Sequence, residues 1–179
     1  QVHQGGTRSG KTYSICQVLI ELCYLNKNAG IIITIVRKTF PALRSSVMRD
    51  FFEILSKGGN YRPELHNKSS ATYKLFGNLV EFISADQPQK LRGRKRHILY
   101  INEANELSLE DFRQLILRTT TRTIIDYNPA DEYHWIYDHV LERNDVEFFK
   151  TTYKDNPYLE QSVIDEIERF KETDENYWR

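Results

Sequence analysis

A glycine-rich loop near the beginning of the chain has the residue types and spacing of a phosphate-binding site. Its sequence, GGTRSGKT, satisfies the pattern G-x-x-x-x-G-K-[ST]. Glycines let a backbone fold around phosphates with its N–H groups pointing inward, and the N-terminus of a following helix favours negative charge. In such loops the lysine reaches the β- and γ-phosphates of a nucleotide, and the hydroxyl coordinates Mg²⁺. The predicted nucleotide-binding residues are Gly5, Gly6, Thr7, Arg8, Ser9, Gly10, Lys11 and Thr12, and Thr12 is also the predicted metal ligand.

Arg8 is an uncommon residue for the interior of such a loop, and two roles are open for it. As a catalytic residue it would stabilise the negative charge that develops on the nucleotide, as arginine fingers do. As an ordinary loop residue it would be exposed to solvent. The sequence favours neither role.

A second candidate site lies where the hydrophobic run Ile98–Ile101 is followed by Asn102 and Glu103. Nucleotide hydrolysis needs one group that holds the metal and another that orients or deprotonates water, and two acidic residues usually end such a strand. Asn102 can accept a hydrogen bond from a metal-bound water or from Thr12, but it supplies no negative charge. Glu103 is therefore the favoured catalytic base, and Glu106 is the competing candidate.

The elements that would position these residues alternate between strands and helices. We expect strands within residues 1–4, 30–39, 71–77, 79–84, 97–102, 121–131 and 146–153, and helices within residues 12–28, 42–59, 108–119, 132–143 and 156–172. Gly77-Asn78 and Asn128-Pro129 are typical of turns, and Ser108 with Asp111 predicts a capping box. Because parallel-looking strands alternate with helices, the predicted fold is α/β, with helices on both sides of a mostly parallel central sheet.

The composition is that of one globular domain of 179 residues, with 40% hydrophobic and 28% charged residues. No apolar run approaches the roughly 18 residues that a membrane span needs. Cys16 and Cys23 lie seven residues apart in a predicted helix, too far to form a disulfide, so free thiols favour a reducing, cytoplasmic compartment. The net charge of zero gives no overall nucleic-acid footprint, although KLRGRKRH is a local basic cluster.

Several segments in order resemble the ATPase domain of the large terminase subunit, the DNA-packaging motor of tailed bacteriophages. These segments are QGGTRSGKT, IVRKTFPALRSSV, KLRGRKRHILYINEANEL, TRTIIDYNPAD and TTYKDNPYLEQSVIDEIE. The resemblance implies an additional-strand (ASCE) P-loop ATPase fold over residues 1–179, which begin with Gln1 and so have an apparently clipped N-terminus. It also implies Mg²⁺-dependent ATP hydrolysis coupled to translocation of double-stranded DNA into a procapsid. No C-terminal nuclease domain fits within this length, so no nuclease activity is expected.

The resemblance further assigns roles to individual residues. Asn128, with Asp126 close by, falls on the motif that couples hydrolysis to movement, and a simple turn is the alternative for Asn128. Subunits of such rings supply an arginine to the ATP of a neighbour, and the candidates are Arg92, Arg94 and Arg96; contact with the DNA backbone is their alternative role. Asn102 would bind Mg²⁺ through water. Gln4, or Gln1, is a candidate for contact with adenine.

The partners implied are double-stranded DNA, the portal protein of the procapsid, the small terminase subunit and further copies in a ring, with a monomer as the isolated state. The expected place is the host cytoplasm, at the procapsid portal and not in the mature virion, with no membrane partner. A nucleotide-binding switch without appreciable turnover and a P-loop kinase are the alternative functions. The five histidines show no metal-ligand spacing, which disfavours a metal hydrolase.

Overall fold

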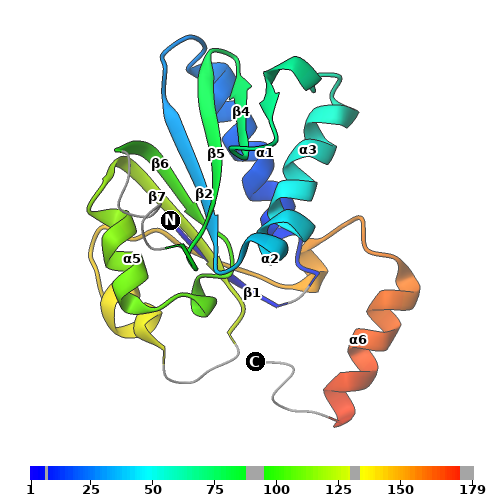
Figure 1. The fold of residues 1–179 in the computed structure, drawn as a ribbon. Coiled ribbons are helices and arrows are strands. Elements are labelled where there is room, and N and C mark those ends of the chain that lie inside the picture. Colours follow the sequence, from blue (N-terminus) through cyan, green and yellow to red (C-terminus); the bar gives the residue numbers. More distant parts are fainter. Residues whose placement is uncertain (7, 88–94, 130–133, 174–179) are drawn as a thin grey trace.

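The computed structural model describes residues 1–6, 8–87, 95–129 and 134–173, which build a sheet covered by helices (Figure 1). Eight strands formed by the described residues follow the order β3-β4-β5-β2-β6-β7-β1-β8. Their bounds are β1 Val2–Gly5, β2 Ile32–Arg37, β3 His66–Asn67, β4 Thr72–Leu75, β5 Asn78–Ser84, β6 Arg96–Ile101, β7 Thr119–Tyr127 and β8 Phe148–Thr151. In this spatial order every neighbouring pair from β5 through β2, β6, β7 and β1 to β8 is parallel. The strands β3 and β4 add an antiparallel edge beside β5. The predicted mostly parallel sheet is confirmed.

Helices lie on both faces of this sheet (Figure 1). One face is covered by α1 (Lys11–Leu25), α2 (Phe40–Ser45) and α3 (Val47–Lys57). The other face is covered by α5 (Leu109–Ile116) and the π-helical turn η3 (Tyr137–Leu141). The short 3-10 turns are η1 Pro63–Leu65, η2 Ala104–Glu106 and η4 Tyr153–Asp155. The three-layer α/β architecture predicted from the sequence is therefore confirmed.

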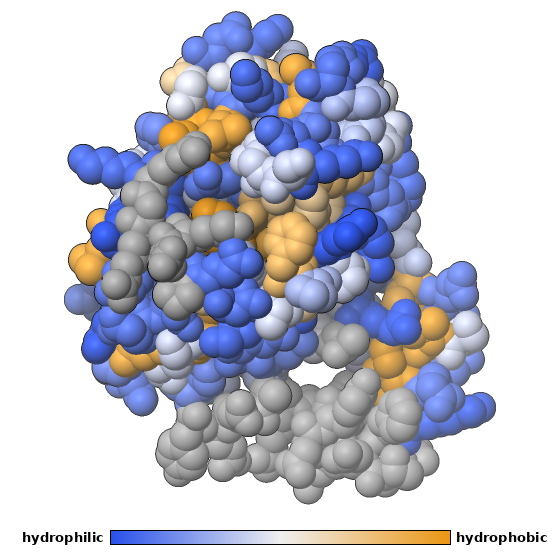
Figure 2. Space-filling model, in the orientation of Figure 1, coloured by the Kyte–Doolittle hydropathy of each residue, from blue (hydrophilic) through white to orange (hydrophobic). Residues whose placement is uncertain are grey.

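The helix α6 (Gln161–Thr173) projects away from the sheet (Figure 1). The face of the molecule in Figure 2 is mostly hydrophilic, and hydrophobic surface is visible on the part of α6 beside the body. Three apolar residues of α6, Val163, Ile164 and Ile167, are only half-buried. None of the helices in the described residues is long and apolar enough to cross a membrane.

The hydrophobic run of β6 is continuous because side chains on both faces of this strand are buried. Ile98 and Tyr100 pack in the cluster that includes α1 and α3, whereas Leu99 and Ile101 pack in the cluster that includes α5. Successive side chains of a strand point to opposite faces, so a central strand under two helical layers needs apolar residues at every position. A shift of β6 by one residue would turn each of these side chains to the other face, so their burial fixes the position of Asn102 directly after the strand.

The strand β7 lies between β6 and the phosphate-loop strand β1, as the additional-strand type of sheet requires. In the parallel register Ile101 of β6 pairs with Ile125, and Gln4 of β1 pairs with Tyr127. The carboxyl ends of the three strands therefore meet at one edge of the sheet. Open α/β sheets bind ligands in the crevice at this edge.

The predicted helix over residues 42–59 is divided into α2 and α3 at Ser46, which has φ −117° and ψ −104°. Ser46 Oγ donates a hydrogen bond to the carbonyl of Ala42 at 2.7 Å. A serine side chain that bonds to the carbonyl four residues earlier competes with continued helix, which explains the break. Periodicity alone does not reveal it, because apolar residues on both sides of Ser46 face the same core.

Two further local predictions differ from the structure. The turn between β4 and β5 is centred on Phe76 and Gly77, which have φ 51° and 80°, rather than on Gly77-Asn78. Asn78 instead begins β5, because its amide donates to the carbonyls of Cys23 and Asn26. The predicted helix over residues 132–143 is present at residues 135–141 but continues from Tyr137 as the π-helical turn η3, and residues 132–133 lie outside the described part of the chain. The capping box of Ser108 and Asp111 is confirmed.

Both cysteines are free and buried in α1, as the sequence predicted. Burial raises the pKa of the Cys23 thiol to about 12, and it raises that of Cys16 well above the ordinary value. Both side chains are therefore neutral core residues.

Candidate nucleotide-binding site

The phosphate loop connects β1 to α1, and its glycines have specific steric roles. Gly10 has φ +80°, which an L side chain rarely adopts, and it lies directly before the first residue of α1. A Cβ on Gly5 would lie 2.5 Å from the carbonyl oxygen of Thr151 on β8. The loop is therefore packed against the strand beside it, and the spacing of these two glycines is a requirement of the fold.

Lys11 begins α1, and its side chain turns back into the loop. Its Nζ donates to the carbonyl of Gly5 at 2.6 Å and to Asn128 Oδ1 at 2.9 Å. Burial lowers the pKa of Lys11, and the nearby charges of Asp126 and Glu103 oppose that shift. The ammonium group is thus held within the loop by neutral oxygen atoms, which a phosphate oxygen can replace.

Glu103 follows β6 with a left-handed backbone, at φ 53° and ψ 59°. Such a conformation is strained for a residue other than glycine, and residues of this kind cluster at functional sites. Glu103 Oε1 accepts a hydrogen bond from Asn128 Nδ2 at 3.3 Å. Burial raises the pKa of Glu103, the charge of Asp126 raises it further, and Lys11 and Arg37 act in the opposite direction. A half-buried carboxylate of this kind is suited to accept a proton.

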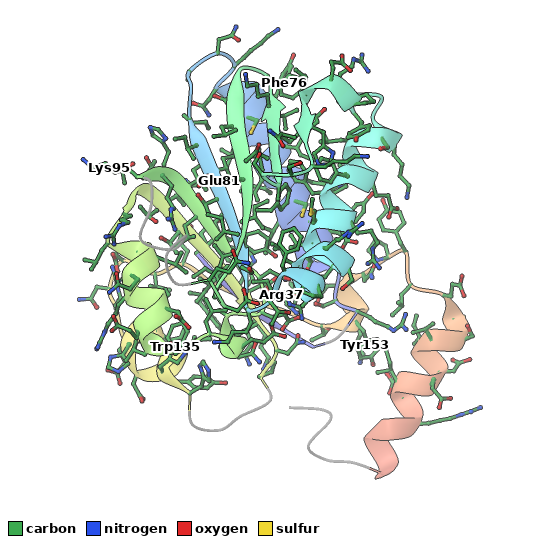
Figure 3. All side chains as sticks on the ribbon, in the orientation of Figure 1. Arg37, Phe76, Glu81, Lys95, Trp135 and Tyr153 are labelled. Atoms are coloured by element: carbon green, nitrogen blue, oxygen red, sulfur yellow. The ribbon has the colours of Figure 1, made fainter. Side chains whose placement is uncertain are left out.

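Glu106, the competing candidate for the base, is held in a different interaction. It accepts two hydrogen bonds from Arg37, at 3.1 Å from Nε and 2.9 Å from Nη2. Arg37 lies at the carboxyl end of β2, beside α2 (Figure 3). The paired geometry occupies both Glu106 oxygens, so the arrangement favours Glu103 over Glu106 as the base.

Asp126 makes more contacts in this site than the sequence suggested. Its fully buried carboxylate accepts hydrogen bonds from Tyr100 OH and from the backbone N–H of Glu103, each at 2.6 Å. Asn102 Nδ2 lies 3.1 Å from both carboxylate oxygens, and Thr12 Oγ1 donates to Oδ2 at 3.3 Å. The sequence named Asp126 only as a neighbour of Asn128. The signal in the sequence was limited to an acidic residue near the end of a predicted strand, which does not reveal these contacts.

Asn102 reaches Thr12, as predicted, but with the opposite hydrogen-bond direction. Its Nδ2 donates to Thr12 Oγ1 at 3.3 Å, whereas the sequence predicted that Asn102 accepts from Thr12. The amide oxygen lies on the other side, 3.4 Å from Ser46 Oγ, whose proton is donated to the carbonyl of Ala42 at 2.7 Å. The Asn102 side chain therefore lies between the Ser46 hydroxyl and the Asp126 carboxylate, with its amide nitrogen toward Asp126.

The remaining predicted residues are brought together only in part. Gln4 Oε1 accepts a hydrogen bond from Tyr127 OH at 3.1 Å, which ties β1 to β7, and adenine contact by Gln4 or Gln1 stays a prediction. Arg8 is exposed, which leaves both of its roles open. Thr7, Arg92 and Arg94 lie outside the described residues.

Arg96 does not suit the role of an arginine donated to a neighbouring subunit. It is 1% exposed and begins β6, at the end of the strand away from the phosphate loop. Burial lowers its pKa. The structure corrects the sequence-based candidate list here, because a side chain buried in its own domain cannot reach another subunit.

Asn156, which the sequence analysis did not single out, supports the phosphate loop from outside. Its Nδ2 donates to the carbonyl of Arg8 at 2.9 Å, and its side chain packs where a Cβ of Gly10 would point. The capping box of Thr152 and Asp155 shapes the turn that places it there. The segment TTYKDNP, next to a strand end, was the available signal.

The oxygen groups beside the loop fit a Mg²⁺ ion bound together with a nucleotide. Among the described residues there is no group of three or more His, Cys, Asp or Glu side chains that would hold a metal. Mg²⁺ in nucleotide sites does not need one, because it keeps several waters and takes one or two protein ligands plus phosphate oxygens. The Thr12 hydroxyl and the Asp126 carboxylate, 3.3 Å apart, are ligand groups of that kind.

The order of the strands and the loop at the head of α1 define the chain as a P-loop domain of the additional-strand type. A model of the phage terminase large subunit family matches residues 1–179, and the chain belongs to this family. The chain is 22% identical over 203 residues to the PBSX phage terminase large subunit of Bacillus subtilis (strain 168). That match covers 98% of this chain and 46% of the relative.

Solved structures show the same fold. The large terminase of a thermophilic bacteriophage superposes with a TM-score of 0.82 at 20% identity, over 95% of this chain and 44% of that one. A structure of the same thermophilic-phage protein in complex with ADP gives a TM-score of 0.79 at 21% identity, with the same coverage. The Thermus phage P74-26 large terminase ATPase domain gives 0.62 at 14% identity, over 95% of this chain and 81% of that domain. The chain thus spans less than half the length of the PBSX protein and of the first of these solved structures.

Proposed function

We propose that the chain is the ATP-hydrolysing motor domain of a large terminase subunit, and that its Mg²⁺-dependent turnover drives double-stranded viral DNA into a procapsid. The observation that carries the proposal is a set of contacts through Asn128. Its side chain accepts from Lys11 of the phosphate loop and donates to Glu103 at the end of β6. A hydrolase with a phosphate sensor needs a group that binds phosphate, a base, and a side chain that contacts both. Lys11, Glu103 and Asn128 are suited to these three roles.

In the proposed reaction Lys11 exchanges its bonds to Gly5 and Asn128 for the phosphate oxygens of ATP. Glu103 orients the attacking water and accepts its proton on the carboxylate, while Asn128 holds that carboxylate in place. Mg²⁺ would be held by the Thr12 hydroxyl, with Asn102 and Asp126 beside it, and when bound it would neutralise charge on the β- and γ-phosphates. Arg8, Arg92 and Arg94 are the proposed arginines for transition-state charge.

The proposed partners are double-stranded DNA, the portal protein, the small terminase subunit and neighbouring copies of the same protein. The proposed place of action is the procapsid portal in the host cytoplasm. Family membership supports these partners in general terms, and translocation of DNA into a procapsid needs the DNA itself and a channel through which it passes.

The test is steady-state release of phosphate from Mg-ATP, with and without double-stranded DNA, over a range of protein concentrations. Lys11→Ala should abolish turnover by removing phosphate binding, and Glu103→Gln should abolish turnover while nucleotide binding is retained. Glu106→Gln is the matched control, since it changes a second carboxylate of the same segment that is paired with Arg37. Full turnover in Glu103→Gln together with loss in Glu106→Gln would reverse the assignment of the base.

A nucleotide-binding switch is the second candidate, because Asn102 lacks the negative charge that usually ends the catalytic strand. It predicts tight ATP binding with negligible phosphate release at every protein concentration, even with DNA present. The concentration series separates the two functions, because an arginine supplied by a neighbour would make turnover rise as subunits assemble. Transfer of phosphate to an added acceptor would instead indicate a kinase.

A further inference from the structure

The negative charge expected at the end of β6 is present in this site, but on the neighbouring strand. Asn102 occupies the position at which an aspartate usually stands, and Asp126 at the end of β7 contacts it at 3.1 Å. Because β6 and β7 run parallel in register, with Ile101 paired to Ile125, both following residues lie at the same height of the sheet. The residue after β6 is an amide, and the neighbouring strand supplies a carboxylate at the same height.

The Asn102 side chain cannot act as the acceptor that the site requires. Its Nδ2 faces both Thr12 and Asp126, and its oxygen is 3.4 Å from Ser46 Oγ on the other side. Thr12 Oγ1 accepts from Asn102 and donates to Asp126 Oδ2. The hydroxyl that would bind Mg²⁺ is therefore held through its proton by Asp126.

We propose that Asp126 takes the place of the missing aspartate at position 102: it orients the Thr12 hydroxyl toward Mg²⁺ and accepts a hydrogen bond from a water bound to that ion. The inference rests on the proposed function, because it concerns the same nucleotide site. It departs from the prediction that Asn102 holds the metal-bound water. It also gives Asp126 a second effect, since the Glu103 N–H donates to its Oδ1 at 2.6 Å and so fixes the start of the segment that carries the base.

The arrangement around Asp126 supports a carboxylate that is held rigidly for a ligand. It is fully buried at the edge of the sheet where β1, β6 and β7 end, and donors from Thr12, Tyr100, Asn102 and Glu103 surround it. Hydrogen bonds to a carboxylate are roughly twice as strong as those between neutral groups. Asn102 Nδ2 lies 3.1 Å from both carboxylate oxygens, so it can release one of them to a metal-bound water while the other donors keep the carboxylate in place.

The test measures how strongly Mg²⁺ tightens nucleotide binding, and it does not depend on turnover. The dissociation constant of a slowly hydrolysed ATP analogue is measured with excess Mg²⁺ and again with EDTA. The readout is the dissociation constant in EDTA divided by that in Mg²⁺, which is the factor by which Mg²⁺ tightens binding. Asp126→Asn should reduce this ratio by about tenfold or more, the size of one charge-assisted hydrogen bond, and it should not weaken binding in EDTA, because it removes a negative charge beside the phosphate loop. Tyr100→Phe is the matched control, because it removes a hydrogen bond of 2.6 Å from the same carboxylate but leaves the charge.

The double variant Asn102→Asp/Asp126→Asn moves the carboxylate back to β6 while it keeps an amide paired with a carboxylate. The proposal predicts that this variant recovers most of the Mg²⁺ effect, because position 102 also lies beside Thr12. The double variant also gives a result if Asp126→Asn alone does not fold.

Three results would overturn the inference. The first is an unchanged Mg²⁺ effect on binding in a folded Asp126→Asn variant. The second is an equal loss of the Mg²⁺ effect in Tyr100→Phe, and the third is no recovery of that effect in the double variant. Either of the last two would assign the loss to general disruption of the site. Failure of the proposed function looks different. In that case the wild-type chain itself would show no Mg²⁺-dependent nucleotide binding, and the inference would fall with it.

Discussion

Replacement of Asn128 by alanine should separate catalysis from nucleotide binding. Asn128 accepts from Lys11 at 2.9 Å and donates to Glu103 at 3.3 Å, so the variant removes both bonds. In the proposed reaction Lys11 exchanges its bond to Asn128 for a phosphate oxygen. Its loss should leave the affinity for Mg-ATP unchanged or slightly higher.

In the proposed reaction the bond to Glu103 acts in the chemical step, because it holds the proposed base. A hydrogen bond to a charged group contributes about 1.5–3 kcal/mol, and a separation of 3.3 Å places this bond at the weak end of that range. A loss of about 1.5 kcal/mol from the transition state lowers kcat roughly tenfold. The expected signature of Asn128→Ala is thus a roughly tenfold fall in kcat with KM nearly constant.

The assay is phosphate release as a function of Mg-ATP concentration, together with equilibrium binding of a slowly hydrolysed analogue. Asn128→Asp is the matched control, since it keeps an acceptor for Lys11, removes the donor to Glu103 and adds a negative charge. It should lose kcat as well, and it should also bind nucleotide more weakly because that charge repels phosphate. A tenfold loss of affinity in Asn128→Ala with kcat intact would refute the reasoning, because it would make Asn128 a nucleotide ligand rather than a support for the base.

Three further predictions concern the base, the loop and its support. Burial raises the pKa of Glu103 above its value in the unfolded chain, so ionisation of this carboxyl opposes folding at neutral pH but not below the unfolded pKa. Glu103→Gln should therefore be more stable than wild type near pH 7. Denaturant unfolding at several pH values should show this difference in stability vanish near pH 4. Gly5→Ala should destabilise the fold by about 1–3 kcal/mol, because its Cβ would meet Thr151, whereas Gly6→Ala has nothing within 4 Å and should unfold like wild type in the same titration. Asn156→Ala should lower the free energy of unfolding by about 0.5–1.5 kcal/mol through the lost bond to the Arg8 carbonyl, and it should weaken nucleotide binding. Calorimetry of melting and of binding measures both effects, and an unchanged affinity would contradict the supporting role.

The sequence was sufficient to predict the elements that carry the site. The spacing of Gly5, Gly10 and Lys11 encodes a loop between a strand and a helix, and the unbroken apolar run before Asn102 encodes a strand buried on two faces. These are short-range patterns, in which the residue types themselves impose the geometry. The additional-strand order came from family resemblance, because the pairing of β7 with β1 joins residues more than a hundred positions apart.

The parts that the sequence did not reveal depend on side chains that meet across strands. Nothing in the sequence around Asp126 shows that Tyr100, Asn102 and Thr12 all point at its carboxylate. The buried position of Arg96 was hidden for the same reason, since a basic run is usually a solvated surface and only the strand register places one member inside. Local breaks such as that at Ser46 arise from a side chain that competes with the backbone, which periodicity does not register.

The place of β7 in the sheet explains why residues at its end can serve both halves of the site. A strand between β1 and β6 has the phosphate loop on one side and Glu103, which follows β6, on the other. Asn128 uses this place to contact Lys11 and Glu103, and Asp126 uses it to contact Thr12 and the Glu103 backbone. A change in what Lys11 and Thr12 bind would therefore reach Glu103 through these two side chains. Under the proposed function, the phosphates of the nucleotide and the position of the proposed base would therefore be coupled at the end of one strand, and hydrolysis would be transmitted to movement from there.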